Sequence, residues 1–225
     1  MKYKKSPLDR FLEQRINETL RMEQNCLEQI RHSINHCKNN IAVCEKQIKK
    51  CSSASLAILE TKKSAFKDNL LIWNTMGHIQ MASIEMKEYM KRLSVESIDE
   101  WEERDVIKSV YTAIYETSKK LVDATADIFK FIKHYFPNYD YRAFTDVRKE
   151  LCRFRESNTS ELTRVRNTID AHRDVEVSVQ IEVIEGLHLA NAVQFIVEYE
   201  GIINELGNET SPIKELGLKR LQACF

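Results

Sequence analysis

The stretch LEQIRHSINHCKNNIAVCEKQIKKC, residues 27–51, decides the fold because its apolar residues recur at alternating steps of three and four. Leucine or isoleucine occupies one position of the repeat, and isoleucine or cysteine occupies the other. The two series are Leu27, Ile34, Ile41 and Ile48, and Ile30, Cys37, Cys44 and Cys51. A seven-residue apolar repeat is typical of a helix that packs lengthwise against another helix. The stretch therefore predicts a long amphipathic helix with one apolar seam.

The cysteines of this seam are predicted to be small buried apolar residues. Residues seven apart on a helix lie about 10 Å from each other along its axis, too far for one disulfide or one tetrahedral metal site. His32 and His36 have the i, i+4 spacing of a helical metal pair, but they fall on the outer side of the seam and are predicted to be solvated. We therefore predict no metal and no other cofactor.

Composition extends the helical prediction to the whole chain. The 225 residues include five glycines and three prolines, and the abundance of Leu, Ile, Glu, Lys and Arg suits long helices. Basic and acidic residues are equal at 34 each, so no global field drives the chain onto nucleic acid or an acidic membrane. No stretch approaches the roughly 18 apolar residues of a membrane span. We expect a cytoplasmic protein without membrane contact.

Clusters of serine, asparagine and proline divide the chain into helical segments. Helices are predicted over about 6–51, 55–93, 97–136 and 141–155, then over a segment capped at 158–160 that carries residues 162–173. The alternating DVEVSVQIEVI, residues 174–184, is typical of a strand, but a lone strand has no partner in this chain. An extended connection and then a helix to about Leu206 are expected instead, with a short tail helix over 212–224.

These segments predict an all-α fold in a single domain, residues 1–225. A long antiparallel helical hairpin, 6–93, packs with an up-down helical bundle, 97–206. Alternatively, the first seam pairs with its copy in another chain. The large aromatic residues inside predicted helices are expected in the core rather than as base-stacking platforms: Trp73, Trp101, Tyr111, Phe129 and Phe136.

The segment LTRVRNTIDAHRD, residues 162–174, has two interpretations. On a helix, one stripe is Leu162, Val165, Ile169 and His172, and the neighbouring stripe is Arg166, Asp170 and Arg173. The first interpretation is a half-buried histidine beside a solvated ladder of charges. The second is a reaction centre, because residues 141–173 hold eight basic and five acidic residues. Arginine binds phosphate oxygens and histidine exchanges protons near neutral pH, which together suit phosphodiester chemistry.

The segment RNTIDAH resembles the signature of HEPN domains, in which an arginine and a following polar residue precede a histidine by four to six intervening residues. Here these residues are Arg166, Asn167 and His172. The trailing AHRD is similar to HEPN proteins of the abortive-infection type, from bacterial defence systems. The resemblance covers about residues 97–206, and it implies that the helical bundle there is HEPN-like.

The resemblance implies a metal-independent endoribonuclease that acts as a homodimer, as a toxin or in anti-phage defence. Two copies of the motif would form one composite site. His172 would be the general acid or base, and Arg166 would stabilise the charge on the scissile phosphate. Asn167 would orient the site, and Asp170 would hold Arg166 or His172.

Two further arginines, Arg164 and Arg173, are candidates for contacts with flanking RNA phosphates. Residues 174–209 contain eight acidic residues and no lysine or arginine, a distribution that weakens RNA binding if those acids face the phosphate site. The alternative function is a non-catalytic helical scaffold or antitoxin-like module that binds a protein partner. It is motivated by the apolar seam and by the zero net charge.

Overall fold

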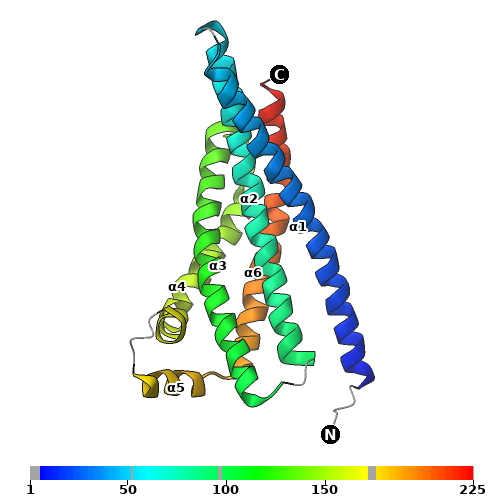
Figure 1. The fold of residues 1–225 in the computed structure, drawn as a ribbon, viewed down its shortest axis with the longest axis vertical. Helices are drawn as coiled ribbons and strands as arrows, with labels where there is room; N and C mark the ends of the chain where they lie inside the picture. Colours follow the sequence, from blue (N-terminus) through cyan, green and yellow to red (C-terminus); the bar gives the residue numbers. More distant parts are fainter. Residues whose placement is uncertain (1–5, 52, 96–97, 172–175, 225) are drawn as a thin grey trace.

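The computed structural model describes residues 6–51, 53–95, 98–171 and 176–224, and its regular elements are all helical. They are α1 (Pro7–Ile48), α2 (Ser53–Val95), α3 (Glu100–Tyr135), α4 (Arg142–Val165), the π-helical turn η1 (Arg166–Ala171), α5 (Val177–Glu185) and α6 (Leu189–Gln222). The predicted all-α class is confirmed. Helices α2, α3 and α6 run along the long axis of the molecule, while α1 leans away from them and α5 lies across one end (Figure 1).

Helix α2 packs on two sides, because it carries two apolar faces. Ile72, Ile79 and Met86 recur every seven residues and belong to the main core, which α2 forms with α3, α4 and α6. Gly77 lies on the opposite face, where a Cβ atom would meet Ile30 Cγ2 of α1 at 3.5 Å. Helix α2 therefore packs with α1, as in the predicted hairpin over 6–93. It also packs with the helices of the bundle, which was predicted as a separate part over 97–206.

The seam of α1 packs along α2 of the same chain. Cys37 and Cys44 are buried and Cys51 is partly buried, so the prediction of small apolar cysteines is confirmed for the first two. Burial raises the pKa of the Cys37 thiol, which favours the unreactive protonated form. His32 and His36 are exposed, as predicted. Within this chain the seam therefore packs against α2, and the alternative pairing of the seam with its copy in another chain stays a prediction.

The predicted helix break near residues 156–160 does not occur, and α4 continues to Val165. Asn158 Nδ2 donates to the carbonyl of Phe154 at 2.8 Å, and Thr159 Oγ1 donates to the carbonyl of Arg155 at 2.5 Å. Both side chains bond back along the helix instead of capping a new one. Phe154 and Leu162 are buried on either side of this polar cluster, so packing carries the helix through it.

The C-terminal prediction is wrong in two places. The expected helix to about Leu206 is interrupted between Glu185 and Leu189, after the short helix α5. The expected stop before residues 212–224 is absent, because α6 runs through Pro212 to Gln222. Proline in a helix interior costs about 3 kcal/mol, and burial of Leu206, Ile213 and Leu216 against the core offsets it.

A cluster of charged side chains joins α1 to the bundle at Glu23, seven residues before Ile30. Lys87 of α2 forms ion pairs with Glu23 of α1 at 2.8 Å and with Glu200 of α6, and its side chain is 15% exposed. Ser83 Oγ donates to Glu23 at 3.2 Å. Burial alone would lower the pKa of Lys87, but its bonds to both carboxylates raise it overall. Lys87 therefore stays protonated and ties three helices together.

Replacing Lys87 with alanine should lower the free energy of unfolding by about 3 kcal/mol, because two largely buried carboxylates lose their counter-ion. Urea denaturation followed by circular dichroism measures the change. Lys130→Ala is the matched control, since its 2.7 Å pair with Asp127 is exposed; it should alter stability by less than about 0.5 kcal/mol. Equal stability of the two variants would show that the cluster does not hold α1.

Candidate functional site

Arg166 stands where α4 ends and the π-helical turn η1 begins. Its backbone N–H contacts the carbonyls of both Leu162 and Thr163. The residues RNTIDA form η1, which packs against α3, α4 and α5. A π turn bonds residue i to residue i+5 and is uncommon, and such turns occur frequently at functional sites. The ideal α-helical spacing that the sequence suggested therefore does not hold from Arg166 onward.

The guanidinium of Arg166 is held by residues of α3. Its Nε lies 3.2 Å and its Nη2 lies 3.1 Å from the same carboxylate oxygen, Oε1 of Glu116. Its Nη1 donates to Oδ1 of Asn167 at 3.1 Å. The Arg166 Cζ also lies 5.3 Å from the ring centroid of Tyr115, a cation–π distance. These contacts fix the plane of the guanidinium relative to α3.

The Arg166 site is open to solvent on one side. The side chain of Arg166 is 32% exposed and that of Glu116 is 40% exposed. A guanidinium has five N–H donors, so the three contacts to Glu116 and Asn167 leave donor capacity for a ligand. The carboxylate of Glu116 offsets the charge of Arg166, so an anion that binds here must share the guanidinium with it or displace it.

Firm packing lies directly beneath this open site. Leu162 and Val165, in the last turn of α4, are fully buried, as their predicted stripe requires. Tyr111 of α3 is buried beside them and donates to Glu161 Oε1 of α4 at 3.2 Å. Burial and the Glu161 carboxylate raise the pKa of Tyr111, which therefore stays a neutral donor. The support for Arg166 is thus a rigid α3–α4 contact.

The structure brings together some of the predicted site residues. Arg166 and Asn167 are in contact, and Arg164 is exposed in the last turn of α4. The backbone of Asp170 lies in η1, but its side chain is outside the described part of the chain. His172 and Arg173 lie outside the described residues altogether.

Two residues of this site were not predicted from the sequence, Glu116 and Tyr115. Both lie on α3, and no local motif marks them. Glu116 precedes its partner Arg166 by fifty residues. The sequence offered one general indication, which is that a part-buried arginine needs a carboxylate partner. Many acidic residues of this chain could be that partner.

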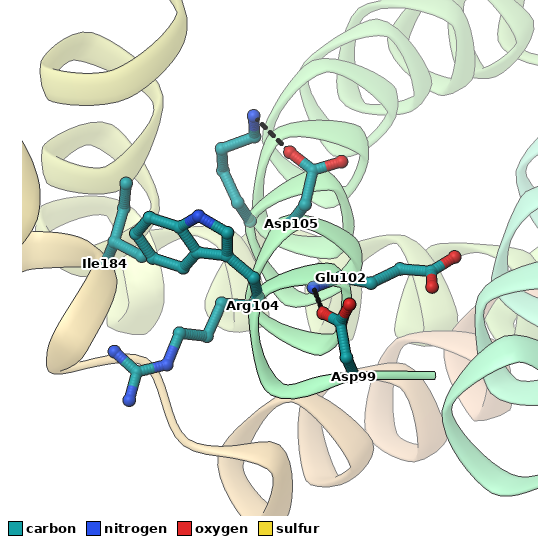
Figure 2. Close-up of a pocket in the computed structure, with 7 residues that line it drawn as sticks. Asp99, Glu102, Arg104, Asp105 and Ile184 are labelled. Atoms are coloured by element: carbon teal, nitrogen blue, oxygen red, sulfur yellow. Dashed lines mark hydrogen bonds and ion pairs between the residues drawn. The ribbon is translucent and has the colours of Figure 1, made fainter. Parts of the chain in front are cut away.

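A separate open hollow of about 440 Å³ lies at the N-terminal turns of α3. It is lined by Asp99, Trp101, Glu102, Arg104, Asp105, Lys108 and Ile184. Figure 2 shows Arg104 and Ile184 on one side of α3, and Asp99 and Glu102 on another. Trp101 is 64% exposed, so its predicted place in the core is wrong. Lys108 and Glu116 are eight residues apart, about 12 Å along α3, so the hollow is distinct from the Arg166 site.

Comparison with known proteins returns no match: no family model, no curated protein sequence and no solved structure matches this chain. Within the described ranges, no helix is long and apolar enough to cross a membrane. The same ranges contain no group of three or more His, Cys, Asp or Glu side chains placed to hold a metal ion.

Glu116→Ala should lower the free energy of unfolding by less than about 1 kcal/mol, because both partners of the ion pair are substantially exposed. Leu162→Ala, which opens a cavity beneath the same site, should cost about 3 kcal/mol. Urea denaturation of both variants measures this difference. An equal loss in the two variants would make the Arg166–Glu116 pair a structural bond rather than a means of orienting the arginine.

Proposed function

We propose that this protein is a metal-independent endoribonuclease of HEPN type that acts as a homodimer. The observation that carries the proposal is the state of Arg166, which is oriented by Glu116 and Asn167 at a π turn yet remains one-third exposed. His172 follows this turn directly in the sequence. An oriented, solvent-accessible guanidinium with a histidine close in the chain suits a phosphodiester substrate.

The reaction is an internal transesterification of RNA. A histidine takes the proton of the ribose 2′-hydroxyl, whose oxygen attacks the adjacent phosphorus. The bond from phosphorus to the 5′-oxygen breaks, and a proton donor protonates that oxygen. The products are a 2′,3′-cyclic phosphate and a 5′-hydroxyl. Arg166 donates to the non-bridging oxygens, where negative charge builds up in the transition state.

This chemistry gives a reason for two copies of the chain. The attacking hydroxyl needs a base, and the leaving oxygen needs an acid. The His172 of one copy acts either as the base or as the acid at a given time. A second copy supplies the second His172. Asp170 is assigned to hold Arg166 or His172, and Arg164 and Arg173 are assigned to flanking phosphates. A role as a toxin or in abortive infection, in the cytoplasm, accords with the family resemblance.

The test is cleavage of a labelled RNA by the purified protein in EDTA. Arg166→Ala and His172→Ala should each reduce the rate at least about 100-fold, because each removes one contribution to the transition state. Arg153→Ala is the control, since Arg153 is an exposed arginine of α4 outside the site and should leave the rate unchanged. Cleavage by both site variants at the parent rate would refute the proposal.

A second measurement separates this chemistry from contaminating nucleases. An RNA with 2′-deoxyribose at the cleaved nucleotide lacks the attacking hydroxyl, so it should not be cut at that position. The products from normal RNA should carry the cyclic phosphate, which mass spectrometry detects. A cut at the deoxy position would contradict the proposed attack by the 2′-oxygen.

A further inference from the structure

Helix α5 and the start of α3 together expose an apolar surface, which we call the α5 patch and define as Trp101, Val177, Ile181 and Ile184. The three α5 residues recur at steps of four and three, so they share one face of the helix. Val177 is 68% exposed, Ile181 is 42% exposed and Trp101 is 64% exposed. Val183 is buried on the other side of α5 and anchors it to the core.

The α5 patch continues into the hollow at the start of α3, which Trp101 and Ile184 both line. Ile184 reaches this hollow from α5 (Figure 2). An exposed apolar stripe next to a hollow is the usual form of a surface that receives an amphipathic helix. The patch therefore needs a partner with apolar side chains at helical spacing.

The N-terminal end of α1 carries a second exposed apolar surface, which we call the α1 end and define as Leu8, Phe11 and Leu12. Leu8 is 64% exposed and Phe11 is 59% exposed. The antiparallel pairing of α1 with α2 explains this exposure. Ile30 lies against Gly77, and Glu23 lies against Lys87. Continuing this register places residues before Leu12 beyond Val95, the last residue of α2.

The sequence segments around the two surfaces have opposite net charge. Residues 1–15 contain five basic residues, Lys2, Lys4, Lys5, Arg10 and Arg15, and two acidic residues. Residues 174–187 contain four acidic residues and no basic residue. At the start of α3, residues 99–108 contain five acidic and two basic residues, and Arg104 is already paired with Glu100 at 2.7 Å. The basic sequence that precedes α1 thus complements the acidic sequence around the α5 patch, while residues 6–15 contain two basic and two acidic residues.

We infer that the α1 end of one copy of this chain docks on the α5 patch of a second copy. Both surfaces lie at the same end of the molecule, opposite the turn between α1 and α2 (Figure 1). A two-fold axis at that end lets each copy give its α1 end to the other and receive the other's in return, so the contact closes as a dimer. The arrangement buries both apolar surfaces.

Helix α5, which carries three of the four residues of the patch, also packs against η1, the turn that begins at Arg166. The inference does not rest on RNA cleavage, because it follows from exposure, helix register and charge. Its test measures association through these two surfaces. A monomeric parent would contradict both proposals, whereas a dimer that the surface variants leave intact would contradict this inference alone.

The experiment is analytical ultracentrifugation of the full chain over a range of micromolar concentrations. The parent should sediment as a dimer. Val177→Glu with Ile181→Glu, and separately Leu8→Glu with Phe11→Glu, should each raise the dimer dissociation constant at least about 30-fold, the effect of losing one central interface residue. Circular dichroism should remain that of the parent, because all four side chains are exposed. High salt should weaken the parent dimer.

The decisive experiment mixes the two double variants. The intact α1 end of the first variant can dock on the intact α5 patch of the second, so the mixture should form heterodimers although each variant alone is monomeric. Val197→Glu on α6 is the matched control; Val197 is 58% exposed but outside both surfaces, and the variant should stay dimeric. A monomeric parent, variants as dimeric as the parent, or a mixture without heterodimers would each overturn the inference.

Discussion

The two-sided burial of α2 is the constraint on which the rest of the structure depends. Most helices of a globular protein bury one stripe and leave the other side in water. Helix α2 instead gives Ile72, Ile79 and Met86 to the main core and presents Gly77 to α1. Ile30 of α1 lies within van der Waals distance of a Cβ built at Gly77, and α1 packs along α2. The position of every α1 residue is then set by its register on α2.

This register explains features that are distant in sequence. It places Glu23 at a seam position beside Lys87, so a carboxylate replaces an apolar side chain where α6 also supplies Glu200. A buried charge is stable only with counter-ions, and here one lysine serves two acids. The same register ends at Val95, so the first turns of α1 extend beyond the end of α2. The exposed leucines and phenylalanine there follow from unequal helix ends, not from a loose fold.

Periodicity predicted the long helices because each buries a continuous apolar stripe, and it predicted the burial of Cys37 and Cys44 for the same reason. It failed where side chains that usually end helices have other uses. Asn158 and Thr159 bond back to the preceding turn, and Pro212 lies within a helix that packing against α2 sustains. It also failed at Trp101, because position in a helix did not show that this side chain would be mostly exposed. Helix ends are decided by tertiary packing, which local patterns do not contain.

The Arg166 site shows the same limit in its chemistry. The sequence identified Arg166 and Asn167, which are adjacent and in contact, but not Glu116, which reaches Arg166 from another helix. The carboxylate of Glu116 would have two opposed effects on the phosphate ligand that we propose. It fixes the guanidinium plane, which lowers the entropy lost on binding, and it repels the anion. Because both groups of the pair are solvated, the repulsion is weakened by water while the orientation by α3 is retained. An exposed carboxylate is therefore compatible with phosphate binding here, whereas a buried one would oppose it strongly.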